Sequence, residues 1–435
     1  MTEYKFLKDE SGNEEFPLSF MQEYMIKQSE MGFEKTGKRE GYTNAGNAVR
    51  ISMRLDIDRF EKSIGRFINE NEMLRSIAVK INGEYTQKII ENYDYKLKLI
   101  IAEGNTKDER YNFAVDIAAK EVQVPFDYFN DISFNPLLIK IDEDDYIFVI
   151  IADHWISDGA SMSVLLGGIF NYYFNPDAKK AAGNSYLQYI KDEREFQTSE
   201  KGKKQAEYWN KELSGYELVD IEKAAVGKKS SGIDHFYKFD IAKLAAVSAR
   251  FKTNNFYVML LAFHMALSFY FEKDDIVIAA TSANRTMKYM HTFGLFAHSV
   301  ANRMSVKDDD KLADLLKFAM KKHSENMINL QACYRFDILQ FCMAYQNFIP
   351  NSSKNALPVE MAELKLPSKR KFDRFYIGAY ESEKEMILVM LGDGERYSED
   401  FMNCIRIGIE STIDAFADEE ATVKTARNLY NDRIK

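Results

Sequence analysis

A strand, a short polar loop and a helix follow one another between residues 144 and 175, and this succession most constrains the fold. The run DDYIFVIIA, residues 144–152, is mostly apolar and indicates a buried strand. The run ASMSVLLGGIFNYYFN, residues 160–175, predicts a helix that ends before Pro176. The connection DHWISDG therefore places a histidine and an aspartate at the end of a core strand, where a cleft can form.

The length of the chain favours two domains, because 435 residues exceed what one hydrophobic core usually covers. Apolar residues make up 46% of the sequence, which is enough for two well-packed cores. The small and polar segment 176–185 is the best candidate for a linker. We expect an α/β fold with mixed sheets in two tandem units, residues 1–178 and residues 179–435.

Local patterns predict further elements on both sides of this linker. Strand 47–55 precedes a helix that Asp58 can cap and that carries Phe60, Ile64, Phe67 and Ile68 on one face. The pair Asn82-Gly83 predicts a hairpin turn. Residues 257–271 predict a buried helix. Further strands are expected at residues 275–281, near the end of 291–306, and at 341–348, 372–380 and 385–393.

Charge and cysteine content exclude several classes of function. The net charge of −9 comes without a basic block, which argues against nucleic acid as a partner. Three cysteines without CxxC spacing argue against a disulfide framework and a structural zinc site. The longest apolar stretch, residues 256–271, is shorter than a membrane-spanning helix, and the first residues lack a signal-peptide pattern. We expect a cytoplasmic protein without a membrane span.

The residues of the DHWISDG loop allow more than one interpretation. His154, held at the end of a strand, can take a proton from an amine or hydroxyl that attacks an acyl group. Asp158 suits pairing with a cation, and Gly159 can adopt backbone angles closed to other residues. Alternatively, His154 is a core histidine and Asp158 a helix N-cap. A zinc pair is disfavoured because no third ligand lies nearby in the sequence.

Seven further segments accompany this loop in a defined order. They are FPLSFMQEYM (16–25), ENEMLRS (70–76), VPFDYFNDISFNPLLIKI (124–141), AEYWNKELSG (206–215), DDIVIAATSANR (274–285), GLFAHSVANRM (294–304) and MAYQNF (343–348). Together with DHWISDG they resemble the condensation domains of nonribosomal peptide synthetases and, more broadly, the chloramphenicol-acetyltransferase-like acyltransferases. In the family hallmark HHxxxDG, the second, catalytic histidine falls on His154, and Asp153 replaces the first.

The resemblance implies a fold and a catalytic arrangement. The family fold is a V-shaped pseudo-dimer of two acetyltransferase-like halves with a central tunnel, and the loop lies at their junction. Asp158 is expected to form an ion pair with Arg285 from the second half, which would join the halves. Asp158, Gly159 and Arg285 are thus expected to be structural residues of the active site.

The resemblance also implies an acyl transfer. The donor acyl group arrives as a thioester on the phosphopantetheine arm of an acyl or peptidyl carrier protein, supplied in trans to a free-standing domain. An amine, or sometimes a hydroxyl, accepts it, and His154 deprotonates the acceptor or stabilises the tetrahedral intermediate. We expect no bound metal or cofactor and a monomer, with a coenzyme A thioester as an alternative donor.

Five residues near the expected site are candidates for substrate binding. Asp153 could raise the His154 pKa or recognise a cationic acceptor, or it could only bond the backbone. His298 and Ser299 stand where the family usually has Asn and Thr, and His298 could bond the intermediate's oxygen or only line the tunnel. Trp155 and Ser157 flank His154, with packing the stronger expectation for Trp155.

Three classes of function remain open from the sequence alone. The first is an amide-forming acyltransferase, with an ester-forming O-acyltransferase as a close variant. The second is a non-catalytic module that recruits carrier proteins, and the third is an epimerase-like relative. The retention of His154, Asp158 and Gly159 favours catalysis.

Overall fold

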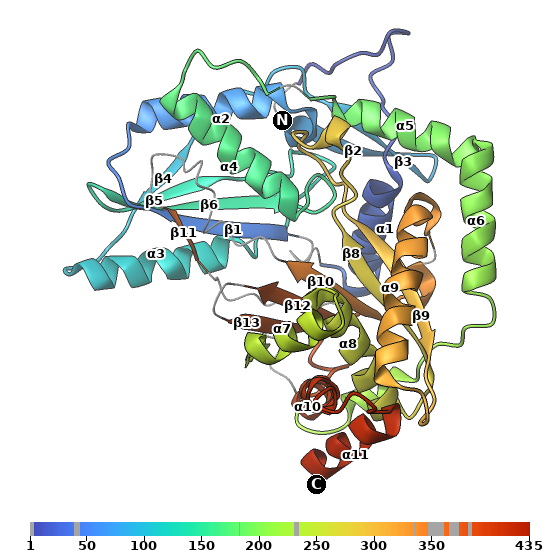
Figure 1. Ribbon diagram of the computed structural model, residues 1–435. Coiled ribbons are helices and arrows are strands. Elements are labelled where there is room, and N and C mark those ends of the chain that lie inside the picture. Colours follow the sequence, from blue (N-terminus) through green and yellow to red (C-terminus); the bar gives the residue numbers. More distant parts are fainter. Residues whose placement is uncertain are drawn as a thin grey trace. The chain divides into compact units, whose positions relative to one another are not determined.

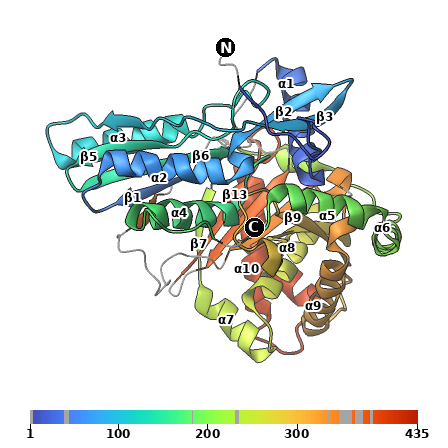
Figure 2. The same ribbon diagram turned by 90° about the horizontal axis from the view of Figure 1, so that it is seen from above.

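The computed structural model describes residues 4–38, 44–181, 183–229, 235–334, 336–346, 361–364, 374–381 and 385–435. The chain divides into two compact units, whose elements Figures 1 and 2 show in sequence colours. Unit 1 comprises the described residues within 1–196, 283–297 and 353–368. Unit 2 comprises those within 197–282, 298–352 and 369–435.

The division differs from the expected boundary between residues 178 and 179. Residues 179–196 belong to unit 1, because helix α5 (Tyr186–Thr198) buries Tyr186, Tyr189 and Ile190 in the unit 1 core. The expected V shape and tunnel, which concern both units together, stay predictions. Within the units, the mixed sheets and helices confirm the α/β fold class.

Unit 1 is built on a five-stranded mixed sheet in the order β11-β1-β6-β5-β4. Its strands are β1 (Asn44–Ile51), β4 (Lys98–Ile101), β5 (Leu137–Asp142), β6 (Asp145–Asp153) and β11 (Met361–Leu364). Of these described strands, β4 and β5 pair in parallel and the other neighbours pair antiparallel. The central strand β6 is buried along its whole length, as the apolar run predicts.

Helices cover both faces of this sheet, which explains why β6 is apolar between its terminal residues Asp145 and Asp153. Along β6, Phe148 and Ile150 pack on the side of α2 (Ile57–Glu70) and α4 (Gly159–Phe174). Val149 and Ile151 pack on the opposite side against α3 (Lys107–Glu121). Figure 1 shows α3 on one side of the sheet and α2 with α4 on the other. Both alternating sets of side chains are therefore in a core.

The local predictions for unit 1 hold with two corrections. The strand predicted at residues 47–55 is β1, which ends at Ile51. The four predicted core residues of α2 are buried, but Asp56 rather than Asp58 caps this helix by accepting a hydrogen bond from the Arg59 N–H. The helix begins one residue before Asp58, so only Asp56 can reach the free N–H groups of its first turn. The hairpin of β2 (Ser76–Ile81) and β3 (Glu84–Ile89) turns at Asn82 and Gly83, both with positive φ. Helix α1 (Phe20–Thr36) and the 3₁₀ turn η2 (Glu72–Arg75) complete the segment.

Unit 2 carries a six-stranded mixed sheet in the order β7-β13-β12-β10-β8-β9. Its strands are β7 (His235–Phe239), β8 (Asp275–Ser282), β9 (His298–Ser305), β10 (Phe341–Gln346), β12 (Phe375–Glu381) and β13 (Met386–Leu391). Five of them, β8, β9, β10, β12 and β13, match the predicted strands in the second half, although residues 347–348 and 372–373 of the predictions lie outside the described residues. Strand β7 was not predicted from the sequence.

Helix α8 (Asn255–Phe271) forms the centre of the unit 2 core, as its apolar sequence predicts. The other helices are α6 (Glu200–Glu212), α7 (Ile241–Arg250), α9 (Leu312–Ile328), α10 (Glu399–Ala415) and α11 (Val423–Ile434). Short 3₁₀ turns lie at η3 (Ile221–Ala225), η5 (Leu330–Ala332) and η6 (Phe336–Ile338). Throughout the described ranges, no helix has the length and apolar character needed to cross a membrane.

Candidate active site

The predicted loop is a tight turn between the end of β6 and the start of α4. Two backbone hydrogen bonds close it, from Ile156 N to Asp153 O at 3.2 Å and from Ser157 N to His154 O at 3.3 Å. The buried strand before the turn and the capped helix after it fix both of its ends. His154 therefore projects from a rigid part of unit 1.

The His154 ring forms a hydrogen bond that fixes its tautomer. Its Nδ1 lies 3.1 Å from the Ser157 carbonyl oxygen. A carbonyl oxygen only accepts hydrogen bonds, so Nδ1 carries the proton and Nε2 of the neutral ring carries a lone pair. The residue is half-buried, unlike most of the loop. The arrangement is that of a general base whose basic nitrogen is Nε2.

Asp158 is enclosed by hydrogen-bond donors. Its side chain caps α4 through Ser161 N at 2.8 Å, and the same oxygen, Oδ1, pairs with Arg285 Nη2 at 2.9 Å. Its other oxygen accepts from Phe296 N at 2.9 Å and Ala297 N at 3.1 Å. Asp158 is only 2% exposed and thus combines the N-cap and ion-pair roles inferred from the sequence.

Arg285 holds its own loop as well as Asp158. Its guanidinium donates to the carbonyl oxygens of Tyr289, Thr292 and Gly294 and lies 4.2 Å from the centre of the Phe296 ring. The pair predicted from the resemblance is therefore present, and the Arg285 side chain is 8% exposed. Residues 283–297 belong to unit 1, however, so this ion pair lies within one unit and does not join two halves.

The conformational argument for Gly159 does not hold. Its φ is not positive, and a Cβ atom added there would meet no atom within 4 Å. Gly294 is the glycine of this site that packing requires, because a Cβ there would lie 2.1 Å from Tyr186 Cδ2. The glycine that this site needs for close packing is therefore Gly294.

Ser161 and Ser133 are two polar residues that the sequence reasoning missed. Ser161 Oγ lies within hydrogen-bond distance of Asp158, Arg285 and the Gly294 backbone. It is therefore a shared partner of the Asp158–Arg285 ion pair, which we call the clamp. Its position three residues after the N-cap Asp158 could have marked it in the sequence as a hydrogen-bond partner of that cap. Ser133 Oγ accepts from Trp155 Nε1 at 2.8 Å, and its carbonyl accepts from Asp153 N at 3.0 Å. No local pattern marks Ser133.

Three predicted substrate-binding residues beside His154 are buried with internal partners. Asp153 Oδ1 accepts from Trp155 N at 2.9 Å, and the indole of Trp155 packs in the core. The Ser157 hydroxyl donates to Asp153 O at 3.0 Å. These contacts favour a packing role for Trp155 and a turn-closing role for Ser157 and Asp153.

His298 and Ser299, the other two predicted substrate-binding residues, begin β9 in unit 2. His298 Nδ1 lies 3.1 Å from the Ser299 carbonyl oxygen, so this ring also carries its proton on Nδ1. Burial lowers the pKa of His298 to about 4, because the imidazolium is poorly solvated there. His298 is therefore a neutral hydrogen-bonding group at neutral pH, and its placement relative to His154 stays a prediction.

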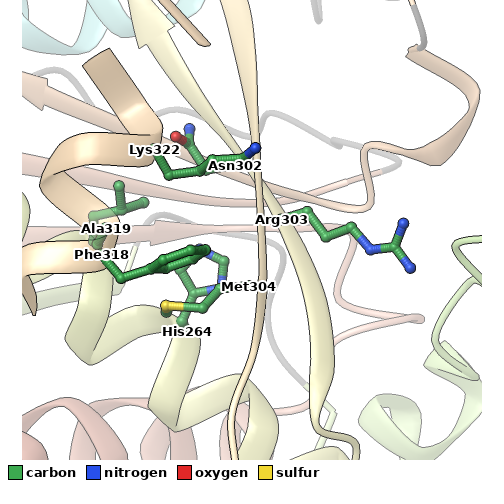
Figure 3. A pocket seen from close by; sticks show the side chains of 8 residues that line it. His264, Asn302, Arg303, Met304, Phe318, Ala319 and Lys322 are labelled. Atoms are coloured by element: carbon green, nitrogen blue, oxygen red, sulfur yellow. The ribbon is translucent and has the colours of Figure 1, made fainter. Parts of the chain in front are cut away.

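A small pocket in unit 2 contains none of the predicted site residues. It holds about 200 Å³, part of it open to solvent. Its lining, shown in Figure 3, is Leu260, His264, Asn302, Arg303, Met304, Phe318, Ala319 and Lys322. His264 is 2% exposed, and burial lowers its pKa to about 3, so it is a neutral core histidine of helix α8. Among the residues that the structure describes, no group of three or more His, Cys, Asp or Glu is arranged to hold a metal ion.

The family comparison assigns the chain to a known class. A sequence profile described as "Condensation domain" matches residues 13–349, and the chain therefore belongs to the condensation-domain family. One of the linear gramicidin synthase proteins of Brevibacillus parabrevis is 28% identical over 320 residues, which cover 70% of this chain and 6% of that protein. Tyrocidine synthase 3 of the same organism is 27% identical over 303 residues, covering 66% and 4%. The chain thus spans under a tenth of the length of these two synthases.

Solved structures agree on the fold. The condensation domain of the monacolin K polyketide synthase MokA superposes with a TM-score of 0.79 at 13% identity, covering 96% of this chain and 99% of that one. The first condensation domain of the calcium-dependent antibiotic synthetase, in complex with a substrate analogue, gives a TM-score of 0.75 at 14% identity, with 95% and 99% coverage. The predicted family and its acetyltransferase-like fold are both confirmed.

Proposed function

We propose that the protein is a condensation-type acyltransferase that joins a carrier-bound acyl or aminoacyl thioester to an amine and forms an amide. The observation that carries this proposal is the His154 ring, with Nδ1–H bonded to a carbonyl and a basic Nε2. The turn that holds it is fixed by the buried strand β6 and by the clamp on Asp158. Membership of the condensation-domain family supports acyl transfer as the chemistry.

In the proposed reaction, the acceptor nitrogen attacks the carbonyl carbon of the thioester. His154 Nε2 takes a proton from the acceptor nitrogen as the C–N bond forms. The tetrahedral intermediate then collapses, the C–S bond breaks, and the proton passes to the departing sulfur of the phosphopantetheine arm. The products are the amide and the free thiol of the carrier protein. The phosphopantetheine arm belongs to the carrier-protein substrate. Cleavage of its thioester bond supplies the free energy that drives amide formation.

A hydroxyl acceptor would use the same base and would yield an ester. The starter condensation domain of the rhizomide synthetase RzmA, here a mutant solved in complex with C8-CoA, has a TM-score of 0.78 with this chain at 13% identity. That complex motivates coenzyme A thioesters as alternative donors in the assay. His154 has the same role with each of these donors and acceptors.

Intact-mass spectrometry of an acyl-loaded carrier protein tests the proposal. The carrier, and separately an acyl coenzyme A, is offered with a panel of amines and alcohols to wild type, His154→Gln and the control His235→Gln on β7. We expect the carrier to lose its acyl mass, and an amide to appear, with wild type and control only. Tight carrier binding without turnover by wild type would instead identify a recruiting module.

A further inference from the structure

Asp153 receives several hydrogen bonds from the turn that follows it. Its Oδ1 accepts from Trp155 N at 2.9 Å, the i to i+2 bond of an Asx turn. Its main-chain oxygen accepts from Ile156 N at 3.2 Å and from Ser157 Oγ at 3.0 Å. One residue at the end of β6 thus binds three of the next four residues.

The remaining residue of those four is His154, and the position of its ring depends on these hydrogen bonds. The Ser157 carbonyl holds His154 Nδ1, and Ser157 is itself located by its hydroxyl bond to Asp153. Trp155 is anchored at its backbone by Asp153 and at its indole by Ser133. A loss of the Asp153 acceptor leaves the Trp155 N–H without its partner in the turn and frees the backbone on which His154 is mounted.

We propose that Asp153 is a positioning residue, whose carboxylate holds the His154 turn and neither binds the acceptor nor supplies charge to the reaction. The side chain is 4% exposed, and one carboxylate oxygen is committed to the backbone of its own turn. The His154 tautomer follows from the Ser157 carbonyl, which needs no neighbouring charge. This inference rests on the proposed function of His154.

Substitutions at Asp153 separate the acceptor atom from the charge. Asp153→Asn keeps an Oδ1 acceptor without the charge, Asp153→Ser keeps a weaker hydroxyl acceptor, and Asp153→Ala removes both. Asp240→Ala is the matched control, because Asp240 Oδ1 accepts from Ala242 N at 3.0 Å in the same i to i+2 geometry at the start of α7.

The kinetic expectation follows from the geometry alone. We expect Asp153→Asn to keep kcat within about 3-fold of wild type, and Asp153→Ala to lower kcat by about 10² with little change in KM, because small misplacements of a catalytic group cost about that much. Asp153→Ser should fall between them and Asp240→Ala should match wild type. The pH profile of kcat/KM should be the same in Asp153→Asn and wild type.

Three kinetic results would overturn the proposal. An Asn variant as impaired as the Ala variant, or one with a displaced pH profile, would assign the role to the charge. A rise in KM confined to cationic acceptors would make Asp153 a recognition residue. If the Ala variant does not fold, the comparison of Asn with Ser decides.

A second readout keeps this test independent of the proposed activity. Nitrogen-15 chemical shifts of the labelled histidines report the His154 tautomer, and amide hydrogen exchange reports protection of Trp155 N–H. Both should be preserved in Asp153→Asn and lost in Asp153→Ala. A wild-type protein without turnover refutes the acyltransferase, whereas an Ala variant with unchanged spectra and exchange refutes the positioning role.

Discussion

His154 and His298 make the same hydrogen bond in different surroundings. Each donates Nδ1–H to a backbone carbonyl at 3.1 Å, one beside the end of β6 in unit 1 and the other at the start of β9 in unit 2. The tautomer is therefore the same in both rings. The His154 side chain is half-buried, whereas His298 is 3% exposed.

The difference in burial separates what the two rings can do. Burial lowers the pKa of His298 to about 4, since desolvation disfavours the charged imidazolium. A ring that must accept a proton during turnover needs a stabilised cation, so His154 is better suited as the base. His298 suits a neutral hydrogen-bonding role. The shared hydrogen bond sets the tautomer, and exposure sets the chemistry.

The largest effect should come from exchanging each ring for an amide. His154→Gln removes the proposed general base and should lower kcat by about 10²- to 10⁴-fold, the usual contribution of such a group. His298→Gln keeps a neutral polar side chain and should lower kcat by less than about 10-fold. Turnover of acyl-loaded carrier by mass spectrometry measures both.

Circular dichroism spectra and melting temperatures provide the control for this pair. Both variants should keep the wild-type spectrum, because glutamine replaces each neutral imidazole with a neutral polar side chain. A His298→Gln variant as inactive as His154→Gln would make the two histidines equal partners in catalysis and would break the comparison.

The next effect should follow from breaking the clamp beside His154. Arg285→Met leaves Asp158 charged and buried without its cation, and removal of one partner from a buried ion pair costs about 3–5 kcal/mol. Urea unfolding measures this loss. Labelled-histidine spectra should change for His154, because Asp158 caps the helix that directly follows the His154 turn. They should also change for His298, because Asp158 accepts hydrogen bonds from Phe296 N and Ala297 N just before it.

Arg50→Met is the matched control for that substitution. Arg50 pairs with Asp145 at 2.6 Å, but Asp145 keeps a second cation, Lys107, at 3.0 Å. We therefore expect a smaller loss of stability and no change at His154. An equal loss in the two variants would contradict the claim that Asp158 depends on a single cation.

The sequence predicted the central strand and the turn well because their signals are local. A strand covered by helices on both faces is apolar along its covered length, and residues 146–152 carry that pattern. Asn82-Gly83 has positive φ at both residues, as the turn requires. The cap of α2 was misplaced by two residues because two aspartates precede its first buried position, and only the helix start decides between them.

The contacts of the site were harder to predict from the sequence, because the residues that make them are far apart along the chain. Asp158 and Arg285 lie 127 residues apart, and only the family resemblance paired them. The resemblance did not show that both belong to one compact unit. Ser133 reaches Trp155 across 22 residues because a bridge between Phe134 and Ala152 aligns their segments, and no periodicity marks such a contact.

The burial of His298 predicts a dependence of stability on pH. Its folded pKa of about 4 lies below the ordinary value of 6.5, so the unfolded chain binds a proton that the folded chain excludes between these pH values. The contribution of His298 to the free energy of unfolding should be complete above pH 6.5 and decline as the pH falls to about 4. In that window, His298→Gln should flatten the slope of unfolding free energy against pH by about 1.4 kcal/mol per unit.

Urea titrations at several pH values measure the slope in wild type and variant. His264 and His323, whose pKa values burial lowers to about 3 and about 4, contribute slopes of the same sign in unit 2. Replacement of His298 should therefore remove its part of the slope of unfolding free energy against pH and leave the parts that come from His264 and His323. An unchanged slope would mean that His298 is solvated, and the contrast with His154 would disappear.

The smallest structural effect is expected from Gly159→Ala. This substitution tests whether substrate occupies the space beside His154. Gly159→Ala adds a methyl group that meets no protein atom within 4 Å, and alanine is well tolerated at the start of a helix. Stability should change by at most about 0.5 kcal/mol, whereas Gly294→Ala, which drives a Cβ into the Tyr186 ring, should cost several times more. Because the Gly159 methyl disturbs nothing in the folded chain, any rise in KM or fall in kcat must come from contact with a substrate. A melting curve and a kinetic series on Gly159→Ala thus test whether the substrate passes over the start of α4, and unchanged kinetics would place its path elsewhere around the His154 ring.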